Sequence, residues 1–357
     1  MIPLAQPQIG RQERRVVNKV LQSLQLTQGP EVKAFESEFS KIVSDRECVA
    51  VNSGTSALHL CLIALGVGKG DEVIVPSFTF AASANVISLV GATPIFVDIN
   101  PLTYCLEPEK IQNAITPRTK AIIAVHLFGL VADMGKIMGI AKSKNLLVIE
   151  DAAQAHLAEF NGTTAGSFGD AAAFSFYPTK NMTTGEGGMA VFAKTNHAQI
   201  CRLLRNQGME KRYENEIVGF NLRMTDVQAA IGRVQLRKLQ KMTSKRIENS
   251  NYLSKYLDTD QLPHVPDGYK HVFHQFTVRI KSSRDTFAKK LREAGVGCDV
   301  YYPTQVHKLK SFNSEELLPE TERACQEVLS LPIHPGLSRR DLKKIILEFN
   351  TLSRNLK

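Results

Sequence analysis

The chain has 357 residues, of which 43% are hydrophobic and 22% are charged. That composition is typical of a globular protein with a sizeable core, and it excludes disordered and fibrous chains. Basic residues exceed acidic ones, giving a formal net charge of +9, which suits a nucleotide diphosphate or a nucleic acid without deciding between them. At about 150 residues per domain, the length predicts two domains.

The six cysteines are scattered and form no C-x-x-C pair, so they indicate neither a metal site nor a disulfide framework. Free thiols are typical of a reducing compartment. The N-terminal residues lack the basic and apolar regions of a signal peptide, and the apolar run at 121–132 is too short to cross a membrane. We therefore expect a soluble, cytoplasmic protein that binds no metal and no membrane.

Between residues 71 and 192, short β-branched apolar runs alternate with helical stretches. This alternation predicts βα units and an α/β fold with a mostly parallel sheet. The expected strands are 72–75, 93–97, 121–125, 146–149, 171–176 and 188–192, and the expected helices between them include 55–66, 107–115 and 133–144.

A long helical pattern from Thr225 to about Leu257 is expected to connect two domains. Beyond it, a strand at 271–280 and helices at 284–294 and 339–352 predict a smaller C-terminal α/β unit. We place the boundary near residue 245, which gives a large domain of residues 1–245 and a small domain of residues 246–357. The basic face of the long helix lacks interleaved aromatic residues, so we interpret it as solvated surface and expect no nucleic acid.

Two familiar nucleotide-binding motifs are absent. The glycines at 66–70 precede a strand instead of opening a helix, which excludes a Rossmann fingerprint. The stretch 129–136 has the wrong spacing for a P-loop, and Ile137 stands where a hydroxyl would bind magnesium.

The first candidate segment, Asn52-Ser53-Gly54-Thr55-Ser56, places a glycine turn at the start of a predicted helix. A helix N-terminus presents unpaired backbone N–H groups, and hydroxyls stand beside them here, so the segment suits a phosphate. Simple capping of the helix by a hydroxyl is an equally good interpretation of this segment alone.

The second segment is an apolar strand that ends in Glu150 and Asp151. Open α/β sheets bind ligands at the carboxyl ends of their strands, so we expect one carboxylate there, where it can pair with a protonated heteroaromatic nitrogen. For this segment alone, a helix cap by Asp151 and a solvent-exposed Glu150 are the preferred interpretation.

The third segment leads from the strand at 171–176 through Lys180 into a glycine-rich return. Lysines are usually surface charges, but one held between a strand end and tight turns is desolvated, which lowers its pKa and leaves a nucleophilic amine. In the fourth segment, Asn221 precedes the long helix and either binds a phosphate or caps that helix. A carboxylate, a lysine and a helix N-terminus are together the parts that hold pyridoxal phosphate.

Eight segments carry a resemblance to a known family: LTQGP (26–30), NSGTSAL (52–58), PSFTF (76–80), EDAAQ (150–154), SFYPTK (175–180), GEGG (185–188), NLRMT (221–225) and LPIHP (331–335). Over nearly its whole length the chain resembles the DegT/DnrJ/EryC1/StrS family of pyridoxal-phosphate-dependent nucleotide-sugar aminotransferases. The resemblance implies the type I aminotransferase fold, with a mostly parallel central sheet in a large domain and a smaller C-terminal α/β domain.

The resemblance also implies roles for individual residues. Lys180 would form the Schiff base with pyridoxal phosphate, and Asp151 would pair with the pyridinium nitrogen. Gln154 would contact the phenolic oxygen, and Phe80 would stack on the ring. The residues expected to bind the phosphate are Thr55, Ser56 and Ser175, joined by Asn221 of the partner subunit in a homodimer with shared active sites.

The implied reaction moves an amino group from an amino acid, by family habit L-glutamate, through pyridoxamine phosphate to a nucleotide-linked keto-sugar with the ketone at C3 or C4. Sugar dehydrases of the family carry histidine in place of the lysine, so Lys180 favours transamination. A non-catalytic regulatory relative and an α/β enzyme with another cofactor are the remaining alternatives. Leu157 departs from the glycine found in many members, and His156, His307 and His334 are interpreted as structural.

Overall fold

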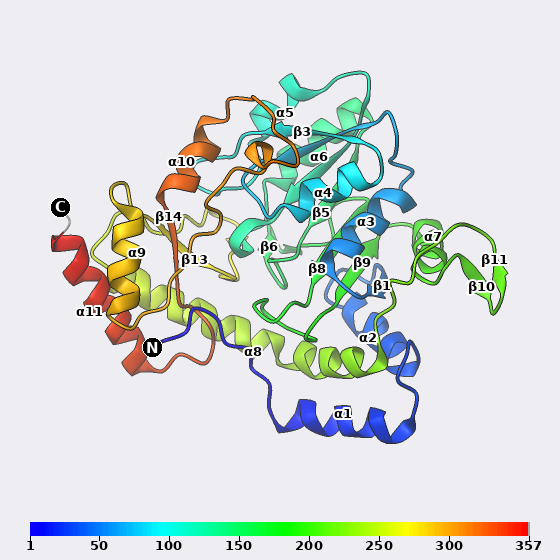
Figure 1. The fold of residues 1–357 in the computed structure, drawn as a ribbon, viewed down its shortest axis with the longest axis horizontal. Coiled ribbons are helices and arrows are strands. Elements are labelled where there is room, and N and C mark those ends of the chain that lie inside the picture. The colour runs from blue at the N-terminus through cyan, green and yellow to red at the C-terminus, as the bar shows by residue number, and fades with distance from the viewer. Residues whose placement is uncertain (356–357) are drawn as a thin grey trace.

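A seven-stranded sheet forms the centre of the chain in the computed structural model, which describes residues 1–355 (Figure 1). Its strands are β1 (Glu47–Val51), β2 (Glu72–Pro76), β3 (Thr93–Val97), β4 (Thr119–Val125), β5 (Leu147–Asp151), β8 (Ala171–Ser175) and β9 (Gly188–Phe192). They lie in the order β1-β9-β8-β5-β4-β2-β3, and only β9 runs antiparallel to its neighbours. The carboxyl ends of β4, β5 and β8 therefore share one edge of the sheet.

Helices cover the sheet, as the βα pattern requires. Contacts join α3 (Gly54–Ala64) to β8 and β9, α6 (Met134–Lys144) to β4 and β5, and α7 (Thr195–Arg205) to β1 and β9. The other helices of this part are α1 (Arg11–Ser23), α2 (Pro30–Ser40), α4 (Ala82–Leu89), α5 (Pro108–Ala114) and the 3-10 turn η1 (Leu127–Gly129). Outside the main sheet, β6 (Glu159–Phe160), β7 (Thr163–Thr164) and β12 (Tyr269–Lys270) form a small sheet, and β10 (Met209–Lys211) and β11 (Glu214–Asn215) form a hairpin.

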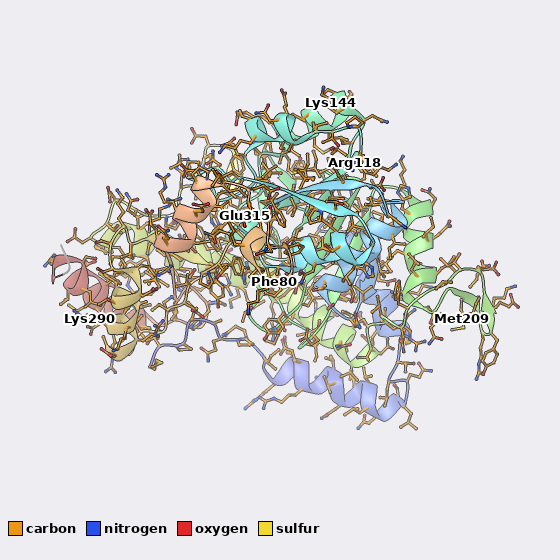
Figure 2. All side chains as sticks on the ribbon, turned by 45° about the horizontal axis from the view of Figure 1, so that its top comes forward. Phe80, Arg118, Lys144, Met209, Lys290 and Glu315 are labelled. Atoms are coloured by element: carbon orange, nitrogen blue, oxygen red, sulfur yellow. The ribbon has the colours of Figure 1, made fainter. Side chains whose placement is uncertain are left out.

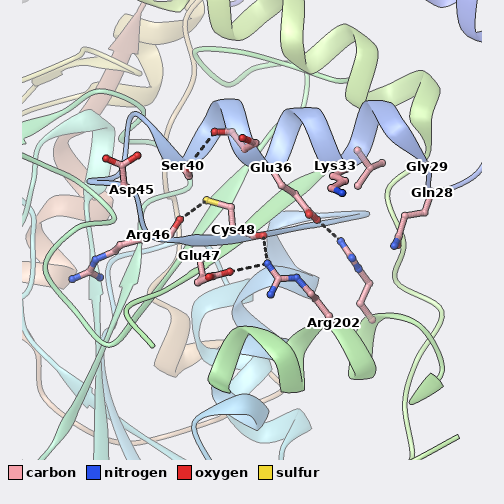
Figure 3. Close-up of a pocket in the computed structure, with 13 residues that line it drawn as sticks. Gln28, Gly29, Lys33, Glu36, Ser40, Asp45, Arg46, Glu47, Cys48 and Arg202 are labelled. Carbon is pink, nitrogen blue, oxygen red and sulfur yellow. Dashed lines mark hydrogen bonds and ion pairs between the residues drawn. The ribbon is translucent and has the colours of Figure 1, made fainter. Parts of the chain in front are cut away.

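Charged side chains close the outer edge of β1 (Figure 3). The guanidinium of Arg205 donates to the Ala50 carbonyl at 2.7 Å and to the Glu36 carboxylate at 2.6 Å, and that carboxylate accepts the Ala50 N–H at 2.8 Å. Arg202 donates to the Cys48 carbonyl at 3.4 Å. Unpaired backbone groups on an edge strand are a template for aggregation, and these side chains satisfy them.

The long helix α8 (Asp226–Tyr256) contributes to two hydrophobic cores. Its Leu239 packs in the core around the seven-stranded sheet, and its Leu253 packs in a second core. The second core gathers side chains of β13 (Phe276–Arg279), β14 (Val328–Leu331), α9 (Arg284–Glu293) and α11 (Arg339–Asn355). The remaining elements are η2 (Val306–Lys308) and α10 (Pro319–Glu327).

These elements confirm the predicted α/β class, and each of the six predicted strands of the central sheet occurs within two residues of its expected bounds. β1 and β14 were not predicted. The strand expected at 271–280 is shorter, because residues before β13 bond to another segment: the Val272 N–H donates to Gly129 O at 2.9 Å and the Gln275 N–H to Phe128 O at 3.2 Å. The boundary near residue 245 falls inside α8 and stays a prediction.

Across residues 1–355, no helix combines the length and the apolar character needed to cross a membrane.

Candidate active site

A cavity of about 450 Å³ lies at the carboxyl ends of β4, β5 and β8. Val125 at the end of β4 pairs with Asp151 at the end of β5, and Asp151 pairs with Ala173 in β8, so the register brings the strand ends together. Six of the eight residues predicted from the sequence line this cavity: Thr55, Phe80, Asp151, Gln154, Ser175 and Lys180.

Two hydrogen bonds hold the Asp151 carboxylate in the cavity wall. Ser83 Oγ donates to Oδ2 at 2.7 Å, and the Ala153 N–H donates to Oδ1 at 3.2 Å. The side chain is buried, so any cation that it meets in the cavity is little screened by solvent. Asp151 is thus an oriented anion at the ligand edge and does not cap a helix.

Glu150 is fully buried and does not line the cavity. Its carboxylate accepts a hydrogen bond from His126 Nε2 at 2.9 Å and three more from the N–H groups of Gly166, Phe168 and Gly169. Burial by itself raises the pKa of Glu150, but these hydrogen bonds outweigh it and hold that pKa below its ordinary value. The interpretation of Glu150 as solvent-exposed is therefore wrong, because a loop folds over this carboxylate and satisfies it.

Lys180 enters the same cavity from the turn after β8. Its backbone N–H donates to Tyr177 O at 2.9 Å, and Phe176 N–H donates to Gly187 O at 2.9 Å, so the glycine-rich return is tied back onto the strand end. Burial lowers the pKa of Lys180 to about 8, although the nearby Asp151 carboxylate raises it. An appreciable fraction of this amine is consequently neutral, and nucleophilic, at physiological pH.

Two neutral imidazoles surround this lysine. Burial, helped by the Lys180 charge, lowers the pKa of His156 to about 3 and that of His274 well below its ordinary value. His156 packs with its ring centroid 5.2 Å from that of Phe174 and 5.8 Å from that of Phe176, which agrees with the structural interpretation of this residue. His274 lines the cavity and was not predicted.

The N-terminus of α3 forms a second wall. Ser53 caps the helix by accepting the Ser56 N–H at 3.1 Å, and Gly54 lies so close to Ser175 that a Cβ on the glycine would approach the serine Cβ to 2.7 Å. Only glycine leaves this space open, and Thr55 and Ser175 face the cavity beside it. Backbone N–H groups and hydroxyls around such a cradle suit an anion.

Ser56 and Asn221 do not line the cavity of this chain. The Ser56 hydroxyl donates to Asn52 Oδ1 at 2.7 Å and lies 2.9 Å from Ser53 Oγ, so it completes the cap. Asn221 is exposed and lies before α8, in a bridge with Asn206. Their phosphate contacts stay predictions, and for Asn221 the predicted contact is with the cavity of a partner subunit.

Gln154 and Phe80 lie on the remaining side, next to a residue that was not predicted. The Phe128 N–H donates to Gln154 Oε1 at 2.7 Å, and Gln154 Nε2 donates to the Tyr302 hydroxyl at 3.0 Å. Phe80 is 60% exposed, and the centroid of its ring lies 6.0 Å from that of Tyr302. The paired Tyr301 and Tyr302, just before a proline, are the only local signal that the sequence offers for this wall.

A larger hollow, of about 640 Å³, lies between α2, β1 and α7 (Figure 3). Its three arginines are already engaged, since Arg205 lies 2.6 Å from Glu36, Arg202 lies 2.9 Å from Glu47, and Arg46 donates to Gly169 O at 2.6 Å. The Lys180 cavity is the better candidate because its lysine and its helix N-terminus still face open space.

Comparisons with known proteins agree with this geometry. The profile of the DegT/DnrJ/EryC1/StrS aminotransferase family matches residues 7–350. The chain is 40% identical over 342 residues to the "Pleiotropic regulatory protein" of Geobacillus stearothermophilus, covering 93% of this chain and 92% of that protein. It is 41% identical over 334 residues to the UDP-N-acetyl-3-dehydro-alpha-D-glucosamine 3-aminotransferase of Acidithiobacillus ferrooxidans, with coverages of 92% and 90%.

Among solved structures, DesV of S. venezuelae in complex with a ketimine intermediate superposes with a TM-score of 0.92 at 38% identity, covering 95% of this chain and 93% of that chain. A match of this extent in both sequence and fold identifies the family. The chain belongs to the DegT/DnrJ/EryC1/StrS aminotransferase family.

Proposed function

We propose that this protein is a pyridoxal-phosphate-dependent aminotransferase that transfers an amino group from an amino acid, L-glutamate by the habit of the family, to the ketone of a nucleotide-linked sugar. The observation that carries the proposal is geometric: the partly buried Lys180 lies in one cavity with Asp151 and the N-terminus of α3. Relatives named as sugar aminotransferases, at similar length and about 40% identity, support the substrate class.

The residues of the cavity fit the cofactor. The phosphate would lie beside Gly54, in the space that a Cβ at this position would fill, next to Thr55 and Ser175. Asp151 would pair with the pyridine nitrogen, and Lys180 would bind the aldehyde carbon. When bound, the cofactor supplies a protonated ring that withdraws electrons from the substrate carbon.

Lys180 would also move protons. Its Nζ would take the proton from the substrate carbon and deliver it to the cofactor carbon C4′. A base of this kind works best with a pKa near the working pH, and burial brings Lys180 to about 8. The neutral His156 and His274 near it carry no competing positive charge at that pH.

We further propose that the working unit is a homodimer in which Asn221 of the partner subunit reaches the phosphate. The β10–β11 hairpin projects away from the body of the chain, with Met209 in it (Figures 1 and 2). Tyr213 in the turn of this hairpin is 79% exposed, and Val218 just after the hairpin is 93% exposed, which fits a surface that a partner subunit covers. Since all six cysteines are free and buried, we place the enzyme in the reducing cytoplasm.

A regulatory protein without turnover is the second candidate, because one relative carries a regulatory name. The visible absorption spectrum of the purified protein, before and after L-glutamate is added, separates the two. We expect a yellow band that glutamate converts to the spectrum of pyridoxamine phosphate. A band that glutamate and other amino acids leave unchanged would favour the regulatory candidate, and no band after pyridoxal phosphate is added would refute the cofactor as well.

A further inference from the structure

Tyr302 contacts two of the side chains that the family resemblance assigns to the cofactor ring, Gln154 and Phe80. Its hydroxyl accepts the hydrogen bond from Gln154 Nε2 at 3.0 Å, and its ring lies against Phe80 with an interplanar angle of 42°. It also lines the cavity and packs near Phe78, at a centroid distance of 6.3 Å. The neighbouring Tyr301 lines the cavity too, but within the described chain no hydrogen bond joins it to Gln154.

Two hydrogen bonds decide which way the Gln154 amide faces. Its oxygen accepts the Phe128 N–H at 2.7 Å, and its nitrogen donates to Tyr302. A flipped amide would set two donors against each other at Phe128, so this orientation is fixed. An amide nitrogen carries two hydrogens, and among residues 1–355 only Tyr302 accepts one of them, which leaves the other free at the cavity wall.

The Tyr302 hydroxyl remains a neutral acceptor throughout the working pH range. Burial raises the pKa of this phenol above its ordinary value, and the nearby Asp151 carboxylate raises it further, although the bond from Gln154 opposes both effects. The hydrogen bond between Tyr302 and Gln154 therefore does not switch with pH.

We propose that Tyr302 is a positioning residue that holds the Gln154 amide with one N–H turned into the cavity, so that the site offers the cofactor's phenolic oxygen a donor. The inference rests on the proposed function, because only a bound pyridoxal phosphate would present that oxygen. A donor at the oxygen stabilises its ionised form, and this lowers the pKa of the protonated nitrogen that links the cofactor to Lys180.

The test is the visible absorption of the cofactor-loaded protein as a function of pH, which reports that protonation without any turnover. In Tyr302→Phe, which removes the hydroxyl and keeps the ring against Phe80, we expect the midpoint to rise by about half to one pH unit, the size of one hydrogen bond. Tyr256→Phe, at an exposed tyrosine of α8 outside the cavity, is the control, and we expect its midpoint to equal that of the wild type.

A double variant separates positioning from direct contact. In a Gln154→Leu background, Tyr302→Phe should add no further shift, because the amide that it positions is gone. Additive shifts would mean that Tyr302 acts on the cofactor directly and would overturn the inference, as would an unchanged midpoint in Tyr302→Phe alone. If the wild type bound no pyridoxal phosphate, the proposed function itself would fail. The spectrum of the wild type alone gives that result, so it is distinct from a failure of the Tyr302 inference.

Discussion

Glu150 and Asp151 are neighbours in the sequence and have different partners in the folded chain. Successive side chains of a strand point to opposite faces, so only one of the two carboxylates lies in the cavity wall. Asp151 lines the cavity with a single side-chain donor, Ser83, whereas Glu150 is saturated by His126 and three backbone N–H groups. Parallel sheets are covered on both faces, so burial of Glu150 could have been expected from its strand.

Replacing Asp151 should affect chemistry, and replacing Glu150 should affect stability. Asp151→Asn keeps the shape but removes the charge that would keep the pyridine nitrogen protonated, so we expect the glutamate half-reaction to slow by at least about 100-fold. Glu150→Gln turns amide hydrogens toward donors in the core and should lower the free energy of unfolding by about 3 kcal/mol. Stopped-flow absorbance measures the rate of the half-reaction, and urea unfolding measures the free energy of unfolding. If the two variants changed both quantities equally, the separate roles of Asp151 and Glu150 would be contradicted.

Lys180 is expected to be essential for turnover. Lys180→Ala removes both the amine that would bind the cofactor and the proton carrier, so we expect the transamination rate to fall by at least about 1000-fold. The surface residue Lys144 (Figure 2) provides the control, and Lys144→Ala should keep full activity with the same circular dichroism spectrum. A Lys180→Ala enzyme with normal turnover would remove the central assignment.

The same lysine should cost stability when the cofactor is absent. The pKa of Lys180 is about 8 in the folded chain and 10.5 in the unfolded chain, so the unfolded chain binds the proton more tightly. Below pH 8, this difference lowers the free energy of unfolding of the cofactor-free protein by about 3 kcal/mol. Between pH 8 and 10.5 the unfolded state holds more protons than the folded state, so stability rises with pH there.

Lys180→Met should therefore stabilise the cofactor-free protein at pH 7, and its advantage should shrink as the pH approaches 10.5. Urea unfolding at several pH values measures this. An advantage that does not change with pH would show that the cost is one of packing and not of charge.

At the scale of elements, Asp226 joins the start of α8 to the start of α2. Its buried carboxylate accepts the N–H groups of Gly29 at 2.8 Å, Val32 at 3.0 Å and Glu31 at 3.3 Å, which are unpaired donors at a helix N-terminus. A carboxylate there also meets the positive end of the helix dipole. A side chain at the start of one helix thus caps another helix.

Asp226→Ala should consequently lower the free energy of unfolding by about 3 kcal/mol, since it leaves buried donors of α2 without an acceptor. Thr225→Ala removes the cap of α8 alone and is the comparison, with an expected loss of about 1 kcal/mol. Chemical denaturation measures the free energy of unfolding of both variants. A larger loss in Thr225→Ala than in Asp226→Ala would contradict the role of Asp226.

The elements that the sequence predicts well are those with local signals. The strands of the central sheet are continuous apolar runs, and α8 has both a helical period and a capping box between Thr225 and Gln228. Asp151 and Lys180 became candidates because each follows a strand of the sheet, and their predicted roles came from the family resemblance, since a helix cap was the preferred interpretation of Asp151 alone. Tyr302 could not, because it lies 148 positions from Gln154 and only the folded chain brings the two together.

At the scale of the whole molecule, one chain does not complete the predicted site. Asn221 is exposed and lies outside the cavity lined by Lys180, although both belong to the predicted set. The segment before α8 is held in place by backbone hydrogen bonds, among them that of the Asn52 N–H with Leu222 O at 3.0 Å. In the proposed homodimer, a second copy would supply this residue.

Mixing two inactive variants tests this sharing of residues. In a heterodimer of Lys180→Ala and Asn221→Ala, one site has the intact lysine and the intact asparagine, and the other site lacks both. Random exchange should therefore restore about a quarter of the wild-type activity, measured at a cofactor concentration too low to load Asn221→Ala alone. The two variants assayed separately, at the same total concentration, provide the baseline. Activity that stays at this baseline, although mass measurements show that dimers have exchanged, would place Asn221 outside the partner's site.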